Sequence, residues 1–159
     1  MKKNWTIVGC AAVFQMLGFA QTTAPRVLTL DMAQTLAQDA LASCHAQGYS
    51  VTVLVVDGLD APKILLRADG APAATTQIGQ MKATTTLLFD RPSGSEAPAT
   101  PGGQPPAPVI PGTINSAGGV PIKVSGVTIG AIAVSGAPGG DKDAACANAA
   151  LAKFSSRWK

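Results

Sequence analysis

The sequence predicts an α+β domain with a mostly antiparallel, five-stranded sheet. The expected elements follow the order helix, two strands, helix, loop, about three strands and helix. Short turns separate consecutive strands, and such turns join antiparallel neighbours, whereas parallel strands need long crossovers. A length of 159 residues suits one domain with a single packed core.

The first 20 residues are interpreted as a signal peptide. Two lysines follow Met1, and residues 7–20 form an apolar run that is too short to span a bilayer comfortably. Small residues favour cleavage after Ala20, because cleavage after Ala24 would place Pro25 behind the scissile bond. We therefore expect a periplasmic or secreted protein with its folded domain at 25–159. The alternative is an uncleaved N-terminal anchor.

The mature chain is nearly neutral. The leader carries two lysines, so its removal takes the formal net charge from +3 to +1. No basic run survives, and the remaining aromatic residues are Tyr49, Phe89, Phe154 and Trp158. Nucleic acids require clustered cations and stacking rings, and anionic membranes require basic segments. We therefore expect neither nucleic-acid binding nor membrane insertion after cleavage.

A first helix is expected to begin after Thr29, which is a suitable N-cap, and to end at Gly48. Asp31 lies in the first turn, where the helix dipole favours an anion. Small and apolar residues recur at helical spacing, which is typical of a half-buried helix. They are Ala33, Leu36, Ala37, Ala40, Leu41 and Cys44.

The first two strands are expected to form a hairpin. Residues 50–57 are β-branched and almost entirely apolar, which indicates a central strand buried on both faces. Residues 58–62 form a turn, and residues 63–68 pair back. Asp57 and Asp60 flank this turn, where aspartate serves turn geometry, so they do not indicate an acid–base pair.

A second helix is expected from about residue 73 or 75 to residue 89. Its predicted buried stripe is Ile78, Met81, Thr85 and Leu88. The three threonines at 84–86 are mediocre helix formers. Packing or a ligand should therefore decide the conformation of this part of the chain.

Residues 93–112 predict an extended or disordered surface loop. Six of the fourteen residues from Pro98 to Pro111 are proline, which excludes a helix or a central strand. Limited proteolysis should therefore cut first between Ser95 and Thr100 and leave fragments that stay associated through the sheet. Initial cuts in the helices instead would show that the loop is packed.

Three more strands are expected near 113–116, at 120–124 and at 127–135, and the last helix opens at Asp141. The corner at 136–140 resembles an anion cradle before a helix N-terminus. Asp141 and Asp143 would already satisfy its amide groups, so we interpret the corner as a turn and N-cap.

Four stretches resemble the GlcG/HbpS-like, haem-degrading family. They are residues 28–57, 66–72, 82–93 (with KATTTLLF) and 118–151 (with GGVPI and VSGAPGGDKDAACA). The resemblance implies a profilin-like α/β/α sandwich that forms homo-oligomers and binds haem or another tetrapyrrole. Relatives carry a short helix where this chain has its proline-rich loop.

The resemblance also implies site residues on the second helix. It assigns Thr85 to the haem iron as a weak ligand, so affinity would come mainly from burial of the macrocycle. Lys82 and Arg91 would bind propionates, and Met81 would lie beside them. The alternatives are a Thr85 bond to the carbonyl one turn back, a core position for Met81, and a salt bridge or helix cap for Arg91.

His45 is the only histidine, which excludes a multi-histidine metal site. A Ser-His-Asp triad would have to use it, yet it lies at the end of the first helix. We interpret it as a solvent-facing residue at a helix C-terminus, and a role as haem ligand is the weaker alternative.

Cys44 and Cys146 are the only cysteines left after cleavage, in an oxidising compartment where disulfides persist. The implied sandwich places the first and last helices side by side, which favours a disulfide. Two buried free thiols are the alternative.

The resulting functional interpretation is an exported haem- or tetrapyrrole-binding protein. The alternatives are a cofactor-free accessory or binding module for a small organic acid, and an enzyme that cleaves haem. No recognised catalytic motif is present, so catalytic residues are not assigned.

Overall fold

The computed structural model describes residues 27–95 and 110–157. The predicted signal peptide and most of the proline-rich loop lie outside these residues. The elements are α1 (Leu30–His45), β1 (Thr52–Asp57), β2 (Pro62–Arg67), α2 (Ala74–Phe89), β3 (Gly119–Val124), β4 (Val127–Ser135) and α3 (Gly140–Arg157).

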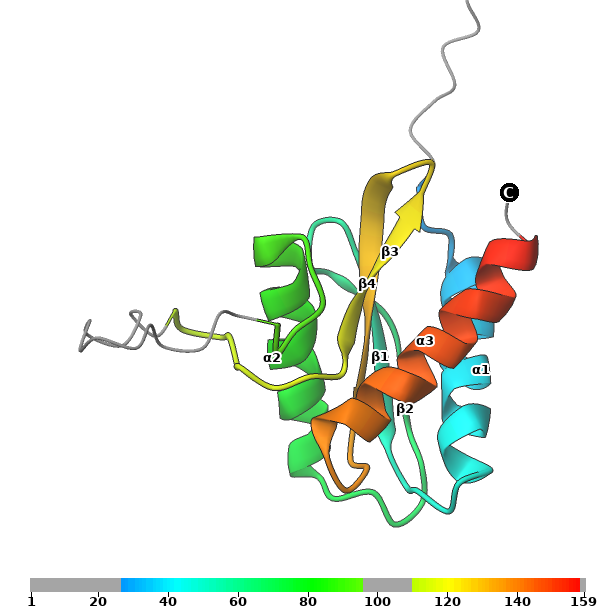
Figure 1. Ribbon diagram of the computed structural model, residues 1–159, viewed down its shortest axis with the longest axis vertical. Coiled ribbons are helices and arrows are strands. Elements are labelled where there is room, and N and C mark those ends of the chain that lie inside the picture. The colour runs from blue at the N-terminus through cyan, green and yellow to red at the C-terminus, as the bar shows by residue number, and fades with distance from the viewer. Residues whose placement is uncertain (1–26, 96–109, 158–159) are drawn as a thin grey trace, which may run out of the picture.

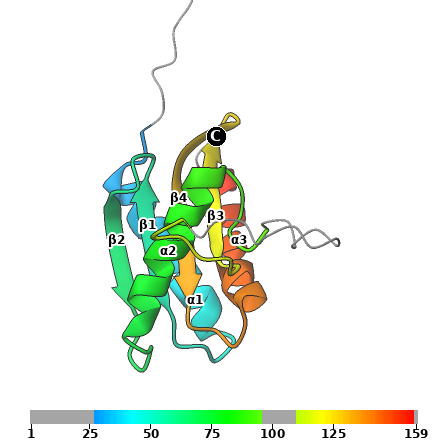
Figure 2. The same ribbon diagram turned by 90° about the vertical axis from the view of Figure 1, so that its left-hand side faces the viewer.

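The strands form one antiparallel sheet in the order β2-β1-β4-β3. Helices α1 and α3 lie side by side on one face, and α2 covers the other face (Figures 1 and 2). The predicted α+β class is therefore confirmed, with three layers.

The predicted fifth strand near 113–116 is wrong, since the sheet of the described residues has four strands. Side chains take the backbone groups that a strand neighbour would use. Ile114 N donates to Thr85 Oγ1 at 2.9 Å, and Ser93 Oγ donates to Ser116 O at 2.7 Å. The segment is therefore fixed to α2 and to the residues that follow α2, outside the sheet.

The core is unequal on the two faces of the sheet. The face under α1 and α3 carries the larger cluster, which includes Val53 and Val55. The face under α2 carries a small cluster of Leu54, Val56, Ala83, Ala131 and Ala133. Strand β1 contributes to both, so the prediction that it is buried on both faces is confirmed.

The predicted N-cap of α1 is confirmed, whereas the predicted buried face of α2 is not confirmed in full. Thr29 Oγ1 accepts a hydrogen bond from Met32 N at 3.2 Å, so the predicted N-cap of α1 is confirmed. The predicted stripe of α2 is only partly right: Thr85 is buried, but Leu88 is 53% exposed, and Gly79 and Ala83 are buried in addition. Small residues allow α2 to lie close to the sheet, and this closeness, rather than apolar periodicity, selects its buried face.

A disulfide joins α1 to α3. The Sγ atoms of Cys44 and Cys146 are 2.13 Å apart, and their Cα atoms are 5.5 Å apart. Both residues are fully buried. The bond therefore fastens the last turn of α1 to the middle of α3.

Two aspartates in the left-handed backbone region hold α2, Asp60 at the middle of the helix and Asp90 at its C-terminal end. Asp60 accepts hydrogen bonds from Gln80 Nε2 at 3.1 Å and from Thr84 Oγ1 at 2.6 Å. Asp90, at the C-cap, accepts from Lys123 Nζ at 3.2 Å and from Thr128 Oγ1. The Thr128 bond, with a further contribution from Lys123, lowers the pKa of Asp90. Helix α2 is thus tied to both hairpins of the sheet.

Candidate functional site

Thr85 lies inside the protein, between α2 and the chain after the proline-rich loop. Its side chain is buried, with 1% of the residue exposed. The hydroxyl donates to Met81 O at 2.7 Å, one turn back, and accepts from Ile114 N at 2.9 Å. The bond to Met81 O is the alternative to iron ligation that the sequence predicts for this hydroxyl. An iron atom could reach the hydroxyl oxygen only if the Ile114 segment moved away.

Replacement of Thr85 by valine should therefore destabilise the protein even without a ligand. The change leaves the Ile114 amide without its acceptor, which we expect to cost about 1–3 kcal/mol. Urea denaturation of the mature protein measures this loss. Thr35→Val at a half-buried position of α1 is the control, and it should change stability much less than Thr85→Val does. Equal stability of Thr85→Val and the wild type would contradict the importance of this bond.

Lys82 also points inward. Its Nζ lies 2.7 Å from Asp143 Oδ2 and 3.0 Å from Val134 O, and its side chain is 2% exposed. Asp143 Oδ1 accepts a hydrogen bond from Ala137 N at 2.9 Å. Burial raises the pKa of Asp143, and the bonds from Lys82 and Ala137 oppose this increase. The Lys82 ammonium therefore connects α2 to α3 and does not face an external propionate.

Gly118 and Gly119 make this ion pair possible. A Cβ atom on Gly119 would lie 2.5 Å from Lys82 O, and one on Gly118 would lie 2.7 Å from Lys82 Nζ and 2.9 Å from Asp143 Cβ. The φ angle of Gly118 is +132°, which glycine adopts readily. The GGVP motif that contributed to the family resemblance thus has a local physical role. It gives the start of β3 room to pass beside α2.

Met81 and Arg91 are more accessible than the other two predicted site residues. Met81 is half-buried, and Arg91 is exposed. The Arg91 guanidinium carbon lies 5.2 Å from the ring centroid of Phe89. Leu88 and Phe89 give the end of α2 an apolar surface beside the Arg91 guanidinium. Of the four predicted residues, only Met81 and Arg91 can meet a ligand from outside without rearrangement.

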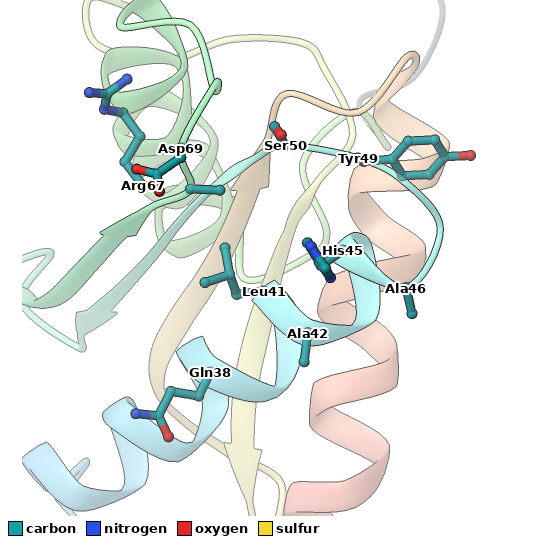
Figure 3. Close-up of a pocket in the computed structure, with 10 residues that line it drawn as sticks. Gln38, Leu41, Ala42, His45, Ala46, Tyr49, Ser50, Arg67 and Asp69 are labelled. Atoms are coloured by element: carbon teal, nitrogen blue, oxygen red, sulfur yellow. The ribbon is translucent and has the colours of Figure 1, made fainter.

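A second candidate site lies between α1 and the chain that follows β2. We call it the α1 groove; it is open to solvent and has a volume of about 650 Å³. Leu41, Ala42 and His45 line the α1 side, and Ala68 and Asp69 line the opposite side. Leu41 and His45 lie one helical turn apart and project from the same side of α1 (Figure 3). The groove therefore combines an apolar wall with an imidazole.

Sequence reasoning identified His45 as exposed but did not identify the groove. The spacing of His45 from Leu41 could have indicated the α1 wall of the groove, because residues four apart share a helix face. The other wall comes from residues 67–69, whose position depends on the pairing of β2 with β1. The sequence pattern gives no distance between these two walls.

Metal binding by protein side chains alone finds no support in the described part of the chain. No three or more histidine, cysteine, aspartate or glutamate residues there are grouped to hold a metal ion. Among residues 27–95 and 110–157, no helix is both long and apolar enough to cross a membrane.

Comparison with known proteins identifies one family. The family model described as haem degrading protein HbpS-like matches residues 28–152. The chain is similar to the crystal structure of HbpS, with 32% identity, a TM-score of 0.70, and coverage of 84% of this chain and 94% of that one. It is also similar to a double mutant of HbpS from Streptomyces reticuli, with 30% identity, a TM-score of 0.70, and coverage of 93% and 97%.

A more distant structure shares the fold. The crystal structure of a PduOC:heme complex has 19% identity, a TM-score of 0.69, and coverage of 80% of this chain and 94% of that one. The comparison with curated protein sequences finds no match.

Proposed function

We propose that this chain, which belongs to the HbpS-like family of haem degrading proteins, binds haem or a related tetrapyrrole. The observation that carries the proposal is the family match over residues 28–152, which extends from the start of α1 through most of α3. The distant structure with the same fold is a haem complex, which adds support. The proposal concerns binding and assigns no catalytic step.

The side chains fit a haem that is held mainly by contacts with its macrocycle. The accessible donors are few, because the Thr85 hydroxyl and the Lys82 ammonium already have protein partners. The α1 groove and the exposed end of α2 both offer apolar surface beside a polar group. The bound haem would supply its iron and conjugated ring, and the protein would supply orientation and partial exclusion of water.

We further propose that the protein is exported and works as a homo-oligomer in the periplasm or outside the cell. The first 20 residues support export, since their basic start and apolar run are typical of a signal peptide. Leu88 and Phe89 support association, because they are 53% and 39% exposed at the end of α2. Sedimentation of the mature protein tests association, and N-terminal sequencing of the exported protein tests cleavage after Ala20.

Titration of the mature protein, residues 21–159, with haem is expected to shift the Soret band. The open site and the small number of ligands favour a Kd of about 1 μM or weaker, which corresponds to about −8 kcal/mol. Metal-free protoporphyrin is the control, since it keeps the macrocycle and removes the iron. Absence of any Soret shift would contradict haem binding and would favour the organic-acid accessory module.

A further inference from the structure

We infer that the α1 groove is the haem site and that His45 is the ligand of the iron. This inference rests on the proposed function, because it assigns a place and a ligand to the proposed haem binding. It differs from the assignment suggested by the family resemblance, which placed the iron at Thr85 on α2. The two surfaces lie on opposite faces of the sheet (Figure 2).

The first argument is the chemistry of the available donors. Imidazole and thiolate are strong haem ligands, and a neutral hydroxyl is a weak one. His45 is the only histidine in the whole sequence. Cys44 and Cys146 are joined in a disulfide, so neither offers a thiolate. Thr85 already donates to Met81 O and accepts from Ile114 N. His45 is therefore the strongest iron ligand that the described surface presents.

The second argument is access. His45 is exposed, and it lines a groove of about 650 Å³, within the range of about 300–1,000 Å³ that is common for ligand sites. Leu41 and Ala42 provide apolar contact for a flat ring on the same wall. The groove is open, so the carboxylates of a haem can stay in water, away from Asp69 on the opposite wall.

The third argument is the fixed position of His45. The neighbouring Cys44 is bonded to α3 through the disulfide. The backbone after the helix folds back, with Gly48 N donating to His45 O at 2.9 Å and Tyr49 N donating to Cys44 O at 3.1 Å. Gln47 Nε2 donates to Ser43 O at 3.0 Å. These bonds hold the last turn of α1, so the backbone that carries the imidazole needs little ordering when His45 binds iron.

The charge on the opposite wall is mixed. Arg67 Nη1 donates to Ala71 O at 2.5 Å, and its side chain projects away from α1 (Figure 3). Neither Arg67 nor Asp69 approaches His45 in this view. Recognition should therefore come from iron ligation and ring contact rather than from a paired propionate, which agrees with modest affinity.

The test compares haem titrations of the wild type, His45→Ala and Thr85→Val. We expect His45→Ala to lose the imidazole-ligated spectrum and to bind haem at least tenfold more weakly. Added free imidazole should restore the spectrum of His45→Ala, because it can occupy the vacated position. Thr85→Val should stay within twofold of the wild type in affinity and keep the same spectrum.

Other results overturn the inference in distinguishable ways. If the wild type binds haem and His45→Ala has the same spectrum and affinity, the groove assignment is overturned while haem binding stands. If the wild type gives no Soret shift, haem binding and the groove assignment are both overturned. Circular dichroism and the thermal midpoint of each variant establish that it is folded before titration.

A second variant tests the groove without changing the ligand. Ala42→Trp fills the space beside His45 from an exposed position on α1, so the core stays intact. We expect it to weaken haem binding at least tenfold. Ala152→Trp is the matched control on the exposed side of α3, and it should bind like the wild type. Wild-type affinity in Ala42→Trp would overturn the assignment of the groove as the site.

Discussion

Replacement of Asp143 by alanine is expected to destabilise the folded protein by about 3–5 kcal/mol. The reason is the position of Lys82, whose side chain is 2% exposed and whose Nζ lies 2.7 Å from Asp143 Oδ2. Without the carboxylate, a buried ammonium keeps only the carbonyl of Val134 as a partner. The Ala137 amide also loses its acceptor. Urea denaturation of the mature protein at neutral pH measures the loss.

Two controls separate the buried pair from a general effect of charge removal. Lys153→Met breaks the surface pair of Lys153 with Asp39, in which the lysine side chain is 53% exposed, and should cost less than about 1 kcal/mol. The double variant Lys82→Met with Asp143→Leu should be more stable than Asp143→Ala alone, because it removes both buried charges. A loss below about 1 kcal/mol in Asp143→Ala would show that Lys82 reaches solvent in the folded protein.

The elements that the sequence predicted correctly are those set by local patterns. Thr29 caps α1 because its hydroxyl meets an amide only three residues away. Strand β1 is central because a continuous apolar run can be buried on both faces. The hairpin of β3 and β4 follows from the turn at Ser125 and Gly126, which both have positive φ. Such features depend on neighbours in the sequence.

The buried face of α2 depends on distant residues, and there the prediction was right for Thr85 but wrong for Leu88. Apolar periodicity selected Ile78 and Leu88 for the core. The structure instead buries Lys82, whose partner Asp143 lies 61 residues further along the chain. A lysine is an unfavourable core residue until its partner is known. For the same reason no role was predicted for Gly118 and Gly119, because their close contacts, such as those with Lys82, are with residues distant in the sequence.

The candidate site was also predicted only as far as local sequence allows. The sequence placed Thr85 on a helix correctly, but its accessibility depends on the Ile114 segment, which follows the proline-rich loop. The exposed position of His45 was predicted from the helix end. The groove beside it required the sheet register that brings residues 67–69 close to α1.

Loss of the Cys44–Cys146 bond is the other change with a large expected effect. The bond links residues 102 positions apart, so it restricts the unfolded chain strongly. The chain-entropy model gives about 4–5 kcal/mol for a loop of this size, and removal of native disulfides typically costs about 2–5 kcal/mol. The double variant Cys44→Ala with Cys146→Ala should therefore unfold at a much lower urea concentration than the oxidised wild type.

Reduction provides an independent measurement of the same bond. The free energy of unfolding of the wild type, measured with reductant, should equal that of the double variant within about 1–2 kcal/mol. Reductant should leave the free energy of unfolding of the double variant unchanged. Thiol titration of the unfolded, non-reduced mature protein should find no free thiol, whereas two titratable thiols would show that the bond is absent in solution.

Because Cys44 precedes His45, the double variant should also loosen the last turn of α1 and weaken haem binding if His45 holds the iron. A double variant that is destabilised yet binds haem as tightly as the wild type would separate the stabilising role of the disulfide from any role in positioning His45.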